Sequence, residues 1–405
     1  MSIPVTTITE EPALPQNIRP IASTIAYYAG FIALGLSVAS LGPTLPSLAQ
    51  HTRTNLGEIS FLFTAHALGY LLGSFQGGRL YDRMRGHLVL SAALFLMVAM
   101  MVLVPTIPAL WALTLVVLLL GVSQGTVDVG GNTLLVWVHR NKVGPFMNGL
   151  HFFFGVGAFL SPVVIAMAMS RTGDIDWAYW ALALMILPAA VLFLYIPSPK
   201  DHASSTSQAS NGISVMTVVL IASFFFLYVG AESSFGGWIY TYALKRDLAN
   251  ATSAAYLTSA FWGALTVGRL VGIPIAARFR PRTILAADLA GCLASISLIL
   301  LMPGSLVATW VGTLGMGFAQ ASIFPTVISL AERRMLITGK VTGWFFVGSS
   351  LGGMTLPWLI GQLFERIGPQ AAMTAILVDL VISVFVFAAL ILYRPNLPQR
   401  IGQPG

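Results

Sequence analysis

The sequence consists of long apolar runs separated by short polar segments. A membrane-spanning helix needs about 20 predominantly apolar residues, and twelve runs meet that length. They occupy residues 21–49, 58–82, 86–105, 108–138, 143–169, 176–196, 213–245, 252–279, 282–302, 305–333, 338–365 and 369–393. This pattern predicts an all-α membrane protein with twelve transmembrane helices.

The polar segments divide the runs into two groups of six. Residues 197–212 form a polar, Ser-rich stretch between the sixth and seventh runs, which predicts a flexible cytoplasmic linker. We therefore expect an N-terminal six-helix bundle over 21–196 and a C-terminal six-helix bundle over 213–393. Residues 1–20 and 394–405 are predicted to form disordered tails.

Glycines at matching positions relate the two groups of runs. Most pairs lie 195 residues apart, and the pair in the fourth and tenth runs lies 196 apart. The pairs are Gly35 and Gly230, Gly42 and Gly237, Gly73 and Gly268, Gly77 and Gly272, Gly121 and Gly317, and Gly157 and Gly352. A near-constant offset indicates an internal duplication, so we expect two pseudo-symmetric bundles that rock around a central site.

Composition and charge support a membrane location. Apolar residues make up 56% of the chain and charged residues 9%, which excludes an ordinary soluble protein. The net charge of +7 comes from Lys and Arg in short loops, so it indicates membrane topology and not a nucleic-acid partner. With residues 1–20 in the cytoplasm, inside segments hold fourteen Lys and Arg and outside loops hold five. We expect a cell inner membrane protein with both termini cytoplasmic. The single cysteine, Cys292, excludes an intrachain disulfide.

A carboxylate interrupts the fourth run. Asp128 follows Gln124 by four residues and precedes Asn132 by four, so all three side chains share one helical face. An intramembrane Asp costs about 2.5–3.5 kcal/mol on insertion scales, and such residues mark ion or substrate paths. Oxygen ligands of this kind suit Na⁺, with Asp128 as the metal ligand. The same carboxylate could instead carry a proton, or form hydrogen bonds that serve packing alone.

Besides Asn132, five further side chains are candidates for substrate contact. Glu232 in the seventh run could accept sugar hydroxyls, bind a second cation or bond to neighbouring hydroxyls. Asn148 and His151 share a face of the fifth run, and His66 lies in the second; each histidine is either a substrate contact or a packing residue. Trp238 offers an aromatic face on which the C–H face of a sugar could stack.

The segment between the second and third runs suggests a family. It contains Gly78, Asp82 and Arg83, and together with the twelve runs in two halves it resembles the major facilitator superfamily. The family loop usually reads G-x-x-x-D-(R/K)-x-G-(R/K), and here the second glycine is one place late, at Gly86. The resemblance implies that Asp82 latches one conformation by pairing across the two halves.

A narrower resemblance concerns the polar residues of the first half. Asp128-x-x-x-Asn132 and Asn148-x-x-His151 are similar to the sodium-dependent glucose transporter branch and, more distantly, to fucose permeases. The similar segments are residues 41–74 and 128–162. The resemblance implies a secondary transporter, a Na⁺- or H⁺-coupled sugar symporter with a monosaccharide substrate. The chain departs from fucose permeases because His151 replaces a Gln and the first run has no acid.

Other functions remain open at this stage. A proton-coupled exporter of amphipathic drugs or lipids needs a larger and more apolar cavity. A non-transporting membrane sensor would bind its ligand without moving it across the membrane. The motif G-x-S-x-G at residues 121–125 lies inside a spanning run, which disfavours a hydrolase built on Ser123. We expect no enzymatic activity, no cofactor beyond the coupling ion, and a monomer in the lipid bilayer.

Overall fold

The computed structural model describes residues 20–199, 214–335 and 339–393, and within them the chain forms α-helices and two short 3₁₀ helices without strands. The all-α prediction is confirmed. The predicted tails and linker lie outside the described residues, apart from residue 20 and residues 197–199.

The first half of the chain contains eight α-helices. They are α1 (Pro20–Val38), α2 (Leu41–Thr52), α3 (Leu56–Ile59), α4 (Phe61–Arg83), α5 (Gly86–Leu103), α6 (Leu110–His139), α7 (Val143–Thr172) and α8 (Asp176–Tyr195), with 3₁₀ turns at Val104–Thr106 and Arg140–Lys142. The predicted run 21–49 is divided into α1 and α2. Pro43 has no backbone N–H to donate to Ala39, so the helix breaks there.

The second half contains seven α-helices. They are α9 (Val215–Lys245), α10 (Ala251–Arg278), α11 (Pro281–Leu301), α12 (Leu306–Gln320), α13 (Ile323–Glu332), α14 (Gly339–Ile367) and α15 (Gln370–Leu392). The predicted run 305–333 is divided into α12 and α13 for the same reason, since Pro325 cannot donate to Ala321.

Eleven segments among the described residues are long and apolar enough to cross a membrane, one fewer than the twelve predicted runs. The run 338–365 forms α14, which is long enough but is not among the eleven. Its polarity has a structural reason. Gly348 and Gly352 of α14 lie against the backbone of α9, and small residues there allow the two helices to approach closely.

Matched glycines make matched contacts in the two halves. A Cβ atom on Gly73 would overlap the carbonyl oxygen of Val122, and one on Gly268 would lie 2.9 Å from that of Phe318. Val122 and Phe318 are themselves 196 residues apart, so the α4–α6 contact recurs as the α10–α12 contact. The same relation holds for a second pair of contacts: Gly121 packs against the backbone of His66, and Gly317 packs against the backbone of Phe261. The predicted pseudo-symmetry is therefore present in the packing.

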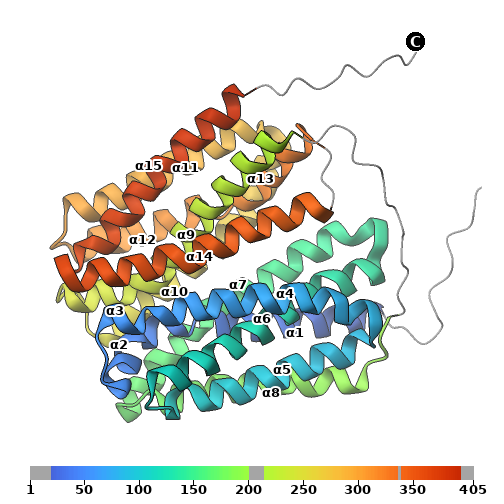
Figure 1. Ribbon diagram of the computed structural model, residues 1–405, viewed down its shortest axis with the longest axis horizontal. Coiled ribbons are helices and arrows are strands. Elements are labelled where there is room, and N and C mark those ends of the chain that lie inside the picture. Colours follow the sequence, from blue (N-terminus) through green and yellow to red (C-terminus); the bar gives the residue numbers. More distant parts are fainter. Residues whose placement is uncertain (1–19, 200–213, 336–338, 394–405) are drawn as a thin grey trace, which may run out of the picture.

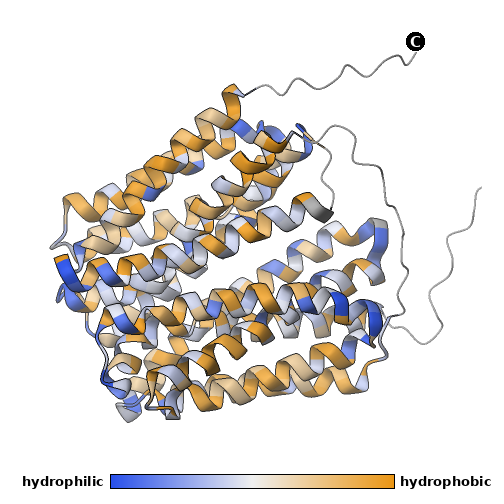
Figure 2. Ribbon diagram, in the orientation of Figure 1, coloured by the Kyte–Doolittle hydropathy of each residue, from blue (hydrophilic) through white to orange (hydrophobic). Residues whose placement is uncertain are grey.

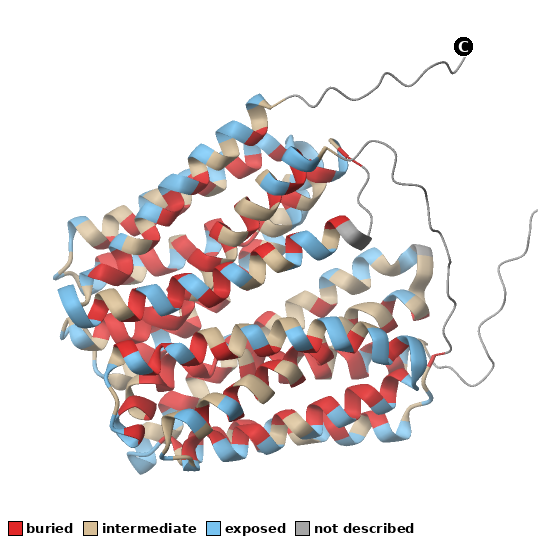
Figure 3. Cartoon of the chain, viewed as in Figure 1, coloured by how far each residue is buried: buried red, intermediate tan, exposed pale blue. Residues whose placement is uncertain are grey.

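The two halves lie side by side and meet along a few helices (Figure 1). The main contacts between them are α7 with α10, α4 with α14, α3 with α14, and α2 with α9 and α10. Hydrophilic residues gather toward the helix ends, whereas apolar residues predominate along the helices (Figure 2). Buried residues mark the inward faces (Figure 3), while large apolar side chains such as Trp111 and Phe385 face outward. This distribution suits a bundle surrounded by lipid.

Candidate functional site

A cavity of about 850 Å³ lies between the two halves. We call the side on which α1 begins and α15 ends the terminal face. The lining extends to this face at Met147, Ala276, Pro281 and Arg333, which lie near helix ends. Five predicted site residues contribute to the wall: His66, Asp128, Asn148, His151 and Glu232. These five residues come from four helices, α4, α6, α7 and α9, and converge on one cavity.

Asp128 is half-buried in the cavity wall. The side-chain amide of Asn132 donates to its Oδ1 at 3.0 Å, and also to its backbone carbonyl at 2.9 Å. The hydroxyl of Tyr70, from α4, forms a further hydrogen bond with the carboxylate. Both donors are neutral, and no Lys or Arg among the described residues forms an ion pair with Asp128. The carboxylate is oriented by neutral neighbours and has no cationic partner among the described residues.

Gln124 lies one turn away from Asp128 but outside the cavity lining. Its amide nitrogen donates to Ser37 Oγ at 2.7 Å, and its Oε1 lies 2.5 Å from Nε2 of His66. Because an amide oxygen only accepts, His66 carries its proton on Nε2. Gln124 thus connects α1, α4 and α6. The direct cation contact predicted for Gln124 has no support in this arrangement, since both ends of the amide are engaged.

The second half contributes a different polar group to the wall. Glu232 is half-buried and accepts a hydrogen bond from the hydroxyl of Tyr228, one turn earlier on α9. Arg269 of α10 also lines the cavity and acts electrostatically on Glu232. The sequence reasoning missed Arg269 and both tyrosines. Arg269 lies nine residues before Arg278, which places it about 13 Å inside the helix end at 1.5 Å per residue, and that depth was a usable signal.

Asn148 and His151 face the cavity from α7, where this helix crosses α10 between the two halves. The His151 ring lies edge-on to Phe31, with centroids 5.9 Å apart. One turn further along α7, Gly155 packs directly against Thr266. His151 is therefore placed one turn from a close contact between the halves.

Trp238 lies elsewhere than predicted. Its indole is fully buried, donates to the carbonyl of Pro357 at 3.0 Å and stacks on Phe364, with Phe63 on its other side. Trp238 does not line the cavity. It joins α4, α9 and α14 at the end of the cavity away from the terminal face, so the predicted sugar contact is replaced by a closing contact between halves.

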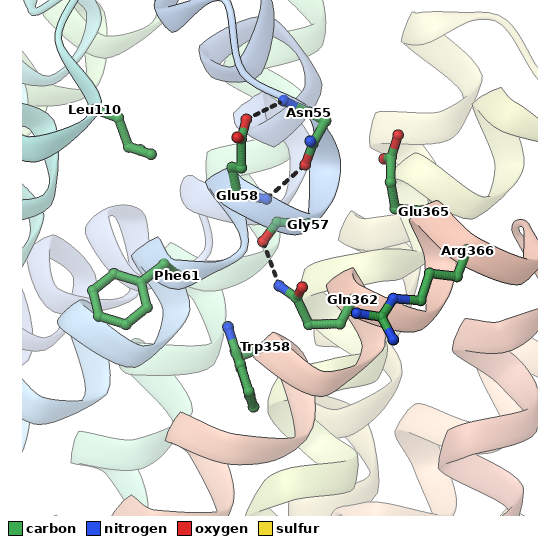
Figure 4. Close-up of a pocket in the computed structure, with 9 residues that line it drawn as sticks. All are labelled: Asn55, Gly57, Glu58, Phe61, Leu110, Trp358, Gln362, Glu365 and Arg366. Carbon is green, nitrogen blue, oxygen red and sulfur yellow. Dashed lines mark hydrogen bonds between the residues drawn. The ribbon is translucent and has the colours of Figure 1, made fainter.

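Polar contacts reinforce this closure at the opposite face, which is the side of the molecule away from the terminal face. The side-chain amide of Gln362 donates to the Gly57 carbonyl at 2.7 Å, and the backbone N–H of Leu56 donates to Glu365 at 3.2 Å. Asn55 and Glu58 cap the first turn of α3 and hold that backbone in place. The surrounding pocket, about 530 Å³, is shown in Figure 4. The cavity is thus closed at the opposite face.

The predicted latch occupies the terminal face. Asp82 and Arg83 are exposed at the end of α4, and Gly78 lies one turn before them. Among the described residues, neither charged side chain forms an ion pair or hydrogen bond with the other half. The latch is therefore not engaged in this arrangement, in which the terminal face is the open one.

Comparisons with known proteins identify the class. The model of the Major Facilitator Superfamily matches residues 27–357. Sodium-dependent glucose transporter 1 of Homo sapiens is 31% identical over 373 residues, covering 83% of this chain and 72% of its own. Major facilitator superfamily domain-containing protein 4A of Mus musculus is 26% identical, with 88% of each chain covered. The chain belongs to the Major Facilitator Superfamily, and it is a multi-pass membrane transporter rather than an enzyme.

Solved structures share the fold. A D-xylose–proton symporter aligns with a TM-score of 0.71 over 93% of this chain and 98% of its own, at 13% identity. The nucleoside transporter NupG aligns with a TM-score of 0.70 over 93% and 99%, at 11% identity. At these identities the likeness concerns the arrangement of helices and not the substrate.

Proposed function

We propose that the protein is a cation-coupled sugar symporter that works by alternating access. The observation that carries this proposal is Asp128, a half-buried carboxylate in the cavity wall that neutral donors orient and that no Lys or Arg in the described part of the chain pairs with. A charge in this position needs an external cation when the cavity closes around it. The names of the relatives favour Na⁺ and glucose, while H⁺ remains the alternative coupling ion.

The cavity suits a monosaccharide. Its volume lies within the range of small-molecule sites, about 300–1,000 Å³. Asn148, His151 and Glu232 offer hydrogen-bond partners for hydroxyl groups, and Phe31 and Trp262 offer apolar faces. Hydroxyl groups and C–H faces of one sugar ring would thus find both kinds of surface.

Alternating access follows from the contacts between the halves. In this arrangement Trp238 and Gln362 hold the opposite face closed, and the cavity reaches the terminal face. Transport requires the halves to exchange these contacts for new ones at the terminal face, where Asp82 and Arg83 are available. With both termini cytoplasmic, as the loop charges favour, the described state faces the cytoplasm.

Uptake of radiolabelled glucose into proteoliposomes tests the proposal. An inward Na⁺ gradient or an inward proton gradient is applied to the wild type, to Asp128→Asn and to Asp174→Asn, an exposed acid outside the cavity. We expect one gradient to drive accumulation in the wild type and in Asp174→Asn but not in Asp128→Asn. Absence of uptake under both gradients contradicts sugar symport, and the apolar part of the wall then favours export of amphipathic molecules.

A further inference from the structure

Two charged residues of the cavity occupy positions where the first half has serines. At the offset of 195, Glu232 corresponds to Ser37 and Arg269 corresponds to Ser74. The register is secure because Gly73 and Gly268, which immediately precede Ser74 and Arg269, make matched contacts. At these two positions the second half therefore carries an acid and a base where the first half carries neutral serines.

The added charges act on each other. Arg269 and Glu232 line the same cavity from the neighbouring helices α10 and α9, and both are half-buried. The guanidinium acts electrostatically on Glu232 and on Tyr228, whose hydroxyl donates to the Glu232 carboxylate. Opposite charges inside a low-dielectric wall attract strongly, so each reduces the cost of placing the other there.

Within the described ranges of the chain, Asp128 has no such charged neighbour. Its hydrogen-bond donors are Tyr70 and Asn132, which are neutral. Its counterpart in the second half at the offset of 196 is Phe324, so the two halves do not carry equivalent carboxylates. The cavity thus contains two acids in contrasting settings, one accompanied by a resident cation and one without.

We propose that Arg269 is the resident counter-charge of Glu232 and thereby confines coupling-cation binding to Asp128. The inference rests on the proposed cation coupling and assigns Arg269 as a determinant of its specificity. Without the guanidinium, Glu232 would become a second carboxylate that draws a cation from solution. Removing the acid and the base together would make these two positions neutral, as they are in the first half, where serines occupy both.

Charge displacement in proteoliposomes on a solid-supported membrane tests this inference without any sugar. Jumps in Na⁺ concentration and in pH are applied to the wild type, Arg269→Gln, Glu232→Gln, the double variant and Arg269→Lys. For Arg269→Gln we expect about twice the displaced charge, because two carboxylates in place of one bind a cation. The double variant and Arg269→Lys should match the wild type, a rescue that a purely structural role of Arg269 would not produce.

The remaining outcomes would overturn the assignment of Arg269 or the proposed function. Displacement in Arg269→Gln equal to that of the wild type overturns the assignment, provided that size-exclusion profiles show folded protein. Failure of the double variant to restore the wild-type response also overturns it. A wild type that responds to cations without taking up glucose refutes sugar symport alone, whereas a wild type that responds to neither cation refutes both proposals.

Discussion

Asn132 donates to the Asp128 carboxylate at 3.0 Å and to the Asp128 backbone carbonyl at 2.9 Å, so a single amide fixes the orientation of the acid one turn before it. The carboxylate lines the cavity and also interacts with the hydroxyl of Tyr70. The charge at the centre of the site is therefore held by its own helix and by α4, both of which belong to the first half.

This geometry predicts the effect of Asn132→Ala. A hydrogen bond to a charged group contributes about 1.5–3 kcal/mol, so its loss should raise the half-saturating cation concentration by roughly tenfold or more while folding is retained. Cation dependence of substrate uptake measures the effect. Thr133→Ala, at the next position of α6, is the matched control, and an equal change in both variants would contradict a specific role for Asn132.

The hydrogen bonds that Gln124 forms with Ser37 and His66 predict that replacing Gln124 lowers the stability of the protein. Gln124→Leu leaves Ser37 and His66 without their partner inside the first half, which costs about 1–3 kcal/mol. We expect a lower unfolding temperature of the detergent-solubilised protein. Adding His66→Phe, which copies Phe261 at the corresponding position of the second half, should recover part of the loss; a further decrease would argue against these hydrogen bonds.

The closing contact of Trp238 predicts a change in accessibility. Trp238→Ala removes the stacking on Phe364 and should favour opening at the opposite face. In a Cys292→Ser background with a cysteine at Ser233 in the cavity wall, an impermeant thiol reagent applied to that face should react roughly tenfold faster, which requires a shift of about 1.4 kcal/mol. Trp111→Ala, in an outward-facing tryptophan, should leave the rate unchanged.

The close approach of α4 and α6 predicts that the effect of a glycine-to-alanine substitution on stability depends strongly on its position. Gly121→Ala would force a methyl group into the backbone of His66, and overpacking of this kind costs about 1–3 kcal/mol. Gly144→Ala, also in a helix but without any heavy atom near the new methyl group, should be neutral. Thermal unfolding of the two variants should differ; equal unfolding temperatures would show that the helices separate easily.

The sequence predicted the helices because apolar runs of spanning length have few alternatives in a bilayer. It also predicted that Asp128, His151 and Glu232 belong to one site, since intramembrane polar groups gather where a cavity hydrates them. Trp238 was placed wrongly. It follows Glu232 by six residues, which at 100° per residue turns its side chain about 240° away from that acid.

Other members of the site could not be predicted from single positions. Tyr70 and Tyr228 resemble ordinary interfacial or packing residues in sequence, and they become site residues through the hydrogen bonds they form. Gln320 shows the converse. It corresponds to Gln124 by the repeat, yet neither atom of its buried amide has a hydrogen-bond partner among the described residues. Phe261 stands where the first half has His66, so Oε1 loses the donor that Gln124 has.

The thinness of the closure formed by Phe63, Trp238 and Phe364 has an electrical consequence. An aqueous cavity open to the terminal face takes the potential of the solution on that side, so most of the membrane voltage falls across this layer of aromatic rings. A charge on one side of the layer differs in energy from a charge on the other by about 2.3 kcal/mol per 100 mV. Under the proposed coupling, the membrane potential across this layer would act on a cation bound at Asp128.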